Sequence, residues 1–267
     1  MAALGVIFPP SRPPEELLDV ARAADDAGVD ELWLWEDCFA ESGVGPAGAA
    51  LAATTRIAVG IGLLPAPLRN VALTAMELAT LARMFPGRLR PGIGHGVLDW
   101  MGQAGVRAAS PMTLLEEHAV ALRALLAGAA VTTAGRYVSL DDVRLAWPPV
   151  EVPPLLIGAV GPKTLELAGR LGDGVILTGE ASAEALPATL GHVARGRAAG
   201  DLSGPVEVVS FLTVEGDMPA SQIAAAVDAL AAAGATAVAV LAVGDASRPL
   251  TDFARLLGEQ VRPLLRG

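Results

Sequence analysis

Several residue types are scarce in this sequence, and each scarcity excludes a class of protein. Cysteine occurs once, at Cys38, which excludes an internal disulfide and a metal site built from paired cysteines. Aromatic residues make up only 4% of the chain. The longest run without a charged residue is Ala229–Gly244, and Gly234 interrupts it. A membrane helix needs about 20 apolar residues, so the sequence predicts no transmembrane span.

The charge balance argues against nucleic acid as a partner. Acidic residues outnumber basic ones by 29 to 19, for a net charge of −10, whereas nucleic-acid binders normally present a basic face. An apolar content of 52% is too high for a disordered chain. The segment Met1–Ser11 has two prolines and no basic residue, unlike a signal peptide. We therefore expect a cytoplasmic globular protein without a membrane partner.

Short apolar runs alternate with helix-length segments along the whole chain. Eight runs are predicted as strands: Leu4–Phe8, Glu31–Trp35, Ile57–Leu64, Arg88–Gly94, Leu155–Ala159, Gly174–Leu177, Val206–Thr213 and Ala237–Val243. Most are nearly continuously apolar, which is typical of parallel strands covered by helices. The alternation predicts an α/β protein with a single (β/α)8 TIM barrel over residues 1–267, and a doubly wound open sheet is the alternative. The stretch Val131–Leu145 alternates around a turn and predicts a hairpin insertion around residues 130–145.

The helices carry recognisable start and stop signals. After the first strand, Pro13 and Pro14 can open a helix that Gly28 closes. Further helices are predicted at about Asn70–Met84, Pro111–Leu126, Pro162–Leu171, Ala183–Ala199, Ala220–Ala233 and Pro249–Leu265. The segment between Trp35 and Thr55 is rich in small residues, and with it each of the eight strands is followed by a helical segment.

In a barrel of this kind, the active site lies where the strands end at their C-terminal side. Glu36 and Asp37 follow the second strand between aromatic residues, and Arg69 opens the helix after the third. His95 follows the fourth strand between two glycines, with Trp100 close behind. A histidine there is accessible and titrates near neutrality, so it is the best candidate for proton transfer. The two carboxylates also fit an ordinary solvated turn.

A glycine-rich turn follows the fifth strand and leads into a helix. Gly161 and Pro162 begin this segment, followed by Lys163, the only lysine of the chain, and Thr164. A helix N-terminus presents free N–H groups and favours an anion, so the segment predicts a phosphate site. An ordinary loop with an exposed lysine is the alternative. Cys38 has no basic neighbour that would lower its pKa, so it is a candidate pocket residue and not a nucleophile.

Four segments resemble successive blocks of the bacterial-luciferase-like superfamily. They are WLWEDCF, RIAVGIGLLPAPLRN, GRLRPGIGHGVLDWMGQAG and PPLLIGAVGPKTLELAGRLGDGVIL, and they occur in the order found in that superfamily. The superfamily contains flavin-dependent monooxygenases and coenzyme F420-dependent oxidoreductases, including methylene-tetrahydromethanopterin reductases. The resemblance implies a (β/α)8 barrel, usually a homodimer, with a flavin or deazaflavin in the barrel mouth and no metal.

The resemblance also implies roles for individual residues. It places a cis peptide bond at Gly62–Leu63, behind the cofactor ring, and a cofactor phosphate near the segment 161–164. The cofactor-binding residues it suggests are Gly62, Leu63, Gly94, Gly158, Gly161, Pro162, Lys163 and Thr164. In the substrate pocket, Trp33, Trp35 and Trp100 are expected as apolar walls, and Cys38 and Arg69 as further pocket residues.

One position departs from the family pattern. Asp37 stands where many members have a histidine after the acid, which puts proton transfer at that position in doubt. The acid–base role is therefore assigned to His95, with Glu36 as helper. The expected activity is coenzyme F420-dependent hydride transfer to or from a small organic substrate. The alternatives are a monooxygenase that uses reduced FMN and O2, and a non-catalytic flavin-binding barrel.

Overall fold

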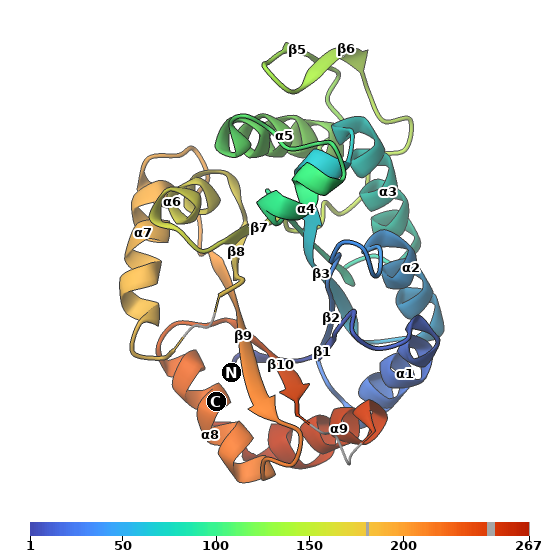
Figure 1. Cartoon of the computed structure of the whole chain (residues 1–267), viewed down its shortest axis with the longest axis vertical. Coiled ribbons are helices and arrows are strands. Elements are labelled where there is room, and N and C mark those ends of the chain that lie inside the picture. The colour runs from blue at the N-terminus through green and yellow to red at the C-terminus, as the bar shows by residue number, and fades with distance from the viewer. Residues whose placement is uncertain (180–181, 245–248, 267) are drawn as a thin grey trace.

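The computed structural model describes residues 1–179, 182–244 and 249–266 of the chain. Within these residues, eight parallel strands close into a barrel in the order β1-β10-β9-β8-β7-β4-β3-β2. Their bounds are β1 (Ala3–Phe8), β2 (Glu31–Leu34), β3 (Ala58–Pro65), β4 (Leu89–Gly94), β7 (Leu156–Ala159), β8 (Gly174–Leu177), β9 (Glu207–Glu215) and β10 (Ala237–Val243). The strands form an inner ring and the helices an outer one (Figure 1). The predicted TIM barrel is confirmed, and the open sheet is excluded.

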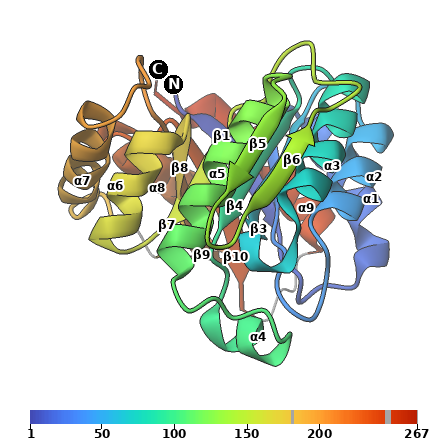
Figure 2. The same cartoon turned by 90° about the horizontal axis from the view of Figure 1, so that it is seen from above.

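The outer ring consists of helices that connect one strand to the next. Their bounds are α1 (Leu17–Ala27), α2 (Val44–Ala53), α3 (Val71–Met84), α4 (Leu98–Gln103), α5 (Pro111–Leu126), α6 (Pro162–Leu171), α7 (Leu186–Ala198), α8 (Ala220–Ala232) and α9 (Leu250–Leu256). The short helix α4 stands out at the end of the barrel where the strands finish (Figure 2). The predicted hairpin is confirmed as β5 (Val131–Ala134) and β6 (Ser139–Val143), outside α5 (Figures 1 and 2).

Local signals explain several of the element ends. The Asn70 side chain accepts a hydrogen bond of 2.9 Å from the backbone N–H of Ala72 and so caps α3. Gly28 ends α1 in the left-handed conformation, with a φ of 88°, which glycine adopts at little steric cost. Pro111 and Pro162 occupy the first positions of α5 and α6, where no N–H is needed.

The small-residue segment before Thr55 contains the helix α2, consistent with a helical segment after each predicted strand. One prediction about the helices needs correction. The predicted helix Pro249–Leu265 is an α-helix only to Leu256, and it continues as a π-helical turn and a 3-10 turn. Glycine at position 258 lets this segment approach the end of α1 closely, because a Cβ on Gly258 would lie 2.2 Å from the Ala27 carbonyl oxygen.

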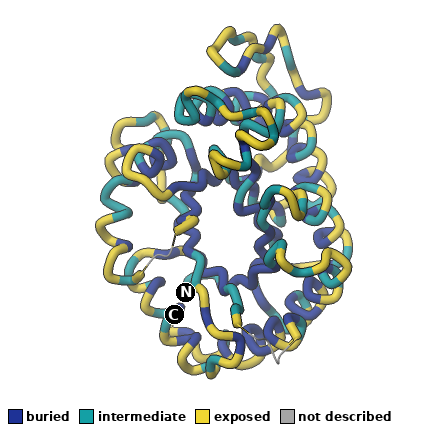
Figure 3. Tube along the Cα trace, in the orientation of Figure 1, coloured by how far each residue is buried: buried dark blue, intermediate teal, exposed yellow. Residues whose placement is uncertain are grey.

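The apolar core has two parts, and the strand ring between them is almost entirely buried (Figure 3). The larger part lies between the strands and the outer helices. The smaller part fills the barrel interior and is built around Trp33, which is fully buried. A Cβ on Gly60 would lie only 2.4 Å from the Trp33 ring, so a glycine makes room for the indole. The interior is therefore a packed core, not a pore.

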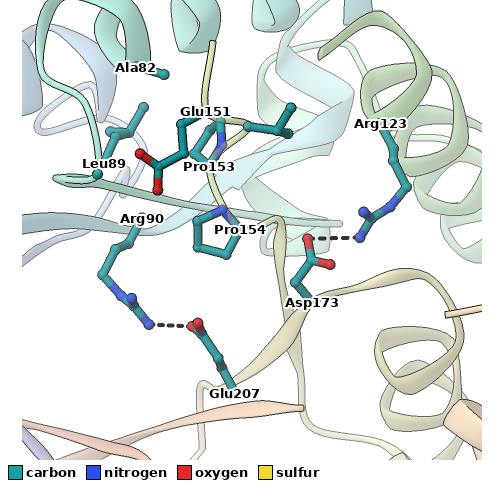
Figure 4. A pocket seen from close by; sticks show the side chains of 11 residues that line it. Ala82, Leu89, Arg90, Arg123, Glu151, Pro153, Pro154, Asp173 and Glu207 are labelled. Carbon is teal, nitrogen blue, oxygen red and sulfur yellow. Dashed lines mark hydrogen bonds and ion pairs between the residues drawn. The ribbon is translucent and has the colours of Figure 1, made fainter. Parts of the chain in front are cut away.

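The end of the barrel where the strands begin holds a cavity of about 440 Å³ lined by ion pairs (Figure 4). Arg90 binds both Glu207 and the buried Glu31, and Arg123 binds Asp173 at 2.9 Å. Burial raises the pKa of Glu31, and Arg90 opposes that effect. Because most charges at this end are paired within the protein, we assign this cavity a structural role. No helix among the described residues has the length and apolar character needed to cross a membrane.

Candidate active site

The opposite end of the barrel opens into a cavity of about 500 Å³, within the size range of cofactor sites. The cavity lies where the strands end, as predicted from the fold. Its lining is mainly apolar and glycine-rich. The lining residues are Trp35, Glu36, Asp37, Gly62, Leu63, Pro65, His95, Gly96, Val97, Trp100, Gly158, Ala159, Val160, Thr178, Gly179, Phe211, Thr213 and Leu241. Eight of the residues predicted from the sequence are among them.

Strand β3 carries an irregularity at the floor of this cavity. The Gly62–Leu63 peptide bond is cis, which confirms the expectation drawn from the family resemblance, and the pairing with β4 shifts between Ile61 and Leu64. The Leu63 side chain extends across the neighbouring strands. A Cβ on Gly94 would lie 2.5 Å from it, and a Cβ on Gly158 would lie 2.2 Å from it. Both glycines therefore make room for Leu63, and Gly94 is not itself part of the cavity lining.

The aromatic side chains of Trp35, just after β2, and Phe211, on β9, form one wall of the cavity. The rings of Trp35 and Phe211 are 5.6 Å apart, and Phe211 also meets the edge of Trp33 at 6.0 Å. The indole nitrogen of Trp35 is buried and has no hydrogen-bond partner among the described residues. A buried donor without a partner is unusual in a folded protein.

Glu36 is held by the protein and is not free for proton transfer. Its carboxylate accepts a bond of 2.6 Å from the Gly43 N–H and one of 2.5 Å from the Arg69 guanidinium. Arg69 also contacts Glu77 at 3.2 Å. The charges of Glu36 and Arg69 therefore neutralise each other. The side chains of these two residues are only 6% and 13% exposed, respectively. Arg69 lies beside a neighbouring groove and does not line the main cavity.

Asp37 and His95 are the ionisable cavity-lining groups that, in the described part of the chain, belong to no ion pair. Burial raises the pKa of Asp37 above its usual range. Burial also lowers the pKa of His95, so the imidazole is neutral at pH 7. A neutral imidazole can accept a proton, and a carboxyl group with a raised pKa keeps its proton up to a higher pH than an exposed one.

Cys38 lies in the neighbouring groove of about 310 Å³ with Phe39, Ser42 and Arg69, and not in the main cavity. Burial, followed by the charges of Glu36 and Asp37, raises the pKa of the thiol. The thiol is therefore protonated at neutral pH, in agreement with the expectation that it is no nucleophile. The Cys38–Phe39 peptide bond is cis, which the sequence did not indicate.

The segment 161–164 begins α6 beside the cavity, but its members point in different directions. Lys163 is exposed and lines a separate groove between α5, α6 and α7, with Glu166, Arg170 and Arg195. Gly161 has open space around its Cα, and the helix start has no side-chain cap. Thr164 is instead buried, and its hydroxyl lies 3.3 Å from His95 Nε2. None of the four lines the main cavity.

Sequence reasoning missed the residues contributed by the last strands. Phe211 and Thr213 from β9, and Leu241 from β10, complete the cavity wall. Phe211 carried a signal, since it is the one aromatic residue of β9. Trp33, expected as a possible cavity wall, lies in the barrel interior. The described residues contain no cluster of His, Cys, Asp or Glu suited to a metal ion.

The cavity fits a planar cofactor ring on two observations. Its volume and apolar lining suit a ring, and Leu63 with the cis bond shapes one side. The uncapped start of α6 and the exposed Lys163 would suit an anionic group outside the cavity.

Comparisons with known proteins agree with this geometry. The family model described as luciferase-like monooxygenase matches residues 4–259. A 5,10-methylenetetrahydromethanopterin reductase from Methanolobus tindarius is 33% identical over 174 residues, which cover 65% of this chain and 53% of the reductase. The chain thus spans about half the length of the curated relatives it matches.

Two solved structures share the fold over essentially the whole chain. One is an F420-dependent secondary alcohol dehydrogenase in complex with an F420–acetone adduct, with a TM-score of 0.87, 21% identity and coverage of 100% of this chain and 99% of the other. The second is the oxygenating constituent of 3,6-diketocamphane monooxygenase from Pseudomonas putida in complex with FMN. It has a TM-score of 0.78, 15% identity and coverage of 100% and 99%. At these identities the likeness establishes the fold.

Proposed function

The chain belongs to the luciferase-like monooxygenase family, and on this premise we propose that it is an oxidoreductase that uses coenzyme F420. The proposed reaction is hydride transfer to or from a small organic substrate. The observation that carries the proposal is the composition of the barrel mouth: a largely apolar cavity in which Asp37 and His95 are the ionisable groups left without an ion pair in the described chain. Relatives named as F420-dependent glucose-6-phosphate dehydrogenases, which are 32% identical to this chain, support the choice of cofactor.

The residues of this chain have separable tasks in the proposed reaction. Leu63 and Trp35 would hold and orient the ring by packing against it, and Phe211 and Trp100 would exclude water from it. The bound deazaflavin supplies or accepts the hydride, because the hydride chemistry belongs to the cofactor. His95, neutral at pH 7, takes up the proton that a substrate hydroxyl loses on oxidation and returns it in the reverse direction.

Glu36 has a positioning role in this proposal and not the helper role first expected. Its carboxylate is bound by Arg69 and by the N–H of Gly43. These contacts fix the chain that leads into Asp37, which lines the cavity beside it. Asp37 occupies the place of the usual histidine and is proposed as a second proton carrier with a raised pKa.

A monooxygenase that uses reduced FMN is the second candidate. It is favoured by the fold that this chain shares with the FMN-bound monooxygenase structure.

The assembly is proposed to be a homodimer, and the outer face of α3 supports this. That face exposes Leu73, Met76 and Met84, and Val120 on the adjacent α5 is also exposed. A single barrel unit and a cytoplasmic location complete the proposal.

Titration of the purified protein with coenzyme F420, FMN and riboflavin tests the proposed function. Binding is detected by fluorescence. The expected result is tight binding of F420 and weak binding of FMN. Binding of FMN alone would replace the first proposal with the oxygen-dependent one. Binding of none of the three would leave a barrel without a cofactor and would overturn both. Riboflavin, which lacks the phosphate, is the matched control for the anion site at α6.

A further inference from the structure

We propose that Thr164 is a positioning residue that fixes the tautomer of His95. The inference rests on the proposed function, since it concerns the histidine assigned to proton transfer there. It replaces the expectation that Thr164 binds a cofactor phosphate. Three segments far apart in the sequence supply the parts: His95 follows β4, Met112 lies on α5 and Thr164 lies on α6.

The geometry places one hydroxyl between two possible partners. Thr164 Oγ1 lies 3.3 Å from His95 Nε2 and 3.4 Å from Met112 Sδ. Thr164 is 6% exposed, so water contributes little to its hydrogen bonding. A hydroxyl has one proton to donate and two lone pairs to accept with, whereas a thioether sulfur can only accept.

These donor and acceptor roles select one arrangement that satisfies all three groups. The Thr164 proton is donated to Met112 Sδ, and the hydroxyl oxygen accepts the N–H of His95 Nε2. Neutral imidazole carries a proton on one nitrogen only, so Nδ1 is then left with its lone pair free. Nδ1 has no partner within the part of the chain that the structure describes, while His95 lines the cavity. The proton acceptor offered to a substrate is therefore Nδ1.

The same contacts explain why Thr164 is not available to a cofactor. Its hydroxyl points back toward α5 and His95, while the exposed members of this turn, Gly161 and Lys163, face outward. Phosphate recognition and histidine orientation are thus divided between neighbouring residues of one helix start. This division makes opposite predictions for substitutions at positions 163 and 164.

Nitrogen-15 NMR of histidine-labelled protein without cofactor tests the tautomer directly. The chain has three histidines, and the signals lost in His95→Gln assign those of His95. In the unsubstituted protein at pH 8, the expected pattern is a protonated Nε2 and an unprotonated Nδ1. A protonated Nδ1 would overturn the proposal.

Three variants test the contributions of Thr164 and Met112 to the His95 tautomer separately. Thr164→Val keeps the shape but removes the acceptor, so the single tautomer is expected to become a mixture, whereas Thr164→Ser is expected to retain it. Met112→Leu removes the sulfur, which frees the Thr164 proton for His95 Nε2 and shifts the population toward the Nδ1-protonated form. An unchanged tautomer in either Thr164→Val or Met112→Leu would overturn the proposal.

Cofactor titrations keep this test distinct from that of the function. Thr164→Val is expected to leave the Kd for F420 unchanged and to lower kcat about tenfold, with recovery in Thr164→Ser. If Thr164→Val raises the Kd for F420 and leaves the tautomer unchanged, Thr164 belongs to the phosphate site and the inference is overturned. If the unsubstituted protein binds no F420, the proposed function fails, and the tautomer measurement still decides the role of Thr164.

Discussion

Leu63 occupies the space that a side chain at position 158 would need, because a Cβ on Gly158 would lie 2.2 Å from Leu63 Cδ2. The contact joins the end of β7 to the irregular part of β3, at the floor of the cavity. The atom in the way belongs to the flexible end of a side chain. Leu63 can therefore move, and the direction open to it is the cavity.

Gly158→Ala is accordingly expected to weaken ring binding more than it weakens the fold. The displaced Leu63 would narrow the cavity, and the Kd for the cofactor should rise about tenfold, equivalent to about 1.4 kcal/mol. The control is Gly191→Ala on α7, where the nearest atom to the new Cβ is 3.9 Å away. Fluorescence titration of both variants checks this, and equal Kd values would contradict it.

Arg69→Met is expected to destabilise the protein through Glu36. The pair is nearly buried, so removing the guanidinium leaves a carboxylate with only the Gly43 N–H as partner. Breaking such a pair costs about 3 kcal/mol of the free energy of unfolding. Arg22→Met, which breaks an exposed pair with Asp19, is the control and should change little. Urea unfolding of the two variants measures the difference, and similar losses would refute the argument.

His118 is expected to make the fold sensitive to acid. Burial lowers its pKa to about 4, whereas the unfolded chain titrates at about 6.5, so the unfolded state binds more protons between these values. Stability is then present above pH 6.5 and is lost as the pH falls toward 4, by about 2 kcal/mol between pH 7 and pH 5.

His118→Leu should abolish that part of the acid sensitivity, because leucine has no proton to bind. The lowered pKa of His95 acts in the same direction, so some acid sensitivity remains. Urea unfolding at pH 5, 7 and 8 measures the effect, and the pH 8 values report packing alone. If His118→Leu loses as much stability on acidification as the unsubstituted protein does, His118 is not a source of the acid sensitivity.

Lys163→Ala is expected to weaken binding of ligands that carry a phosphate. Lys163 has no ion pair among the described residues, whereas Arg170 and Arg195 in the same groove are paired with Glu116 and Glu166. Loss of a charge-assisted bond should raise the Kd for F420 and FMN about tenfold. Riboflavin binding should not change, and Arg22→Ala on α1 controls for net charge. Unaltered F420 binding would remove Lys163 from the site.

Met76→Glu is expected to dissociate the proposed dimer. Met76 is 57% exposed on the apolar outer face of α3, and a buried, unpaired carboxylate there would oppose association. Leu264→Glu, at a similarly exposed position near the C-terminus, is the control. Sedimentation velocity should show a dimer for the control and a monomer for Met76→Glu. A monomeric unsubstituted protein, or a dimeric Met76→Glu variant, would contradict the prediction.

The elements that could be predicted are those whose signals lie within their own residues. Helices α5 and α6 have the predicted bounds, because a proline starts each of them and an apolar face runs along each. Helix α2 has no such signal. It forms where Gly43 is bound by the Glu36 carboxylate and packs against β3, since a Cβ on Gly43 would lie 2.7 Å from Ile61.

The sequence by itself determined the barrel and the end of it at which the site lies, because strand and helix periodicities are local and the strand ends follow from them. It also placed Asp37 and His95 at that end. Only the tertiary structure decided which of the charged groups at this end are bound by other residues. Glu36 is bound by Arg69, 33 residues away, and Thr164 is turned toward His95, 69 residues away. Such pairings depend on distances between remote segments, which no local pattern encodes.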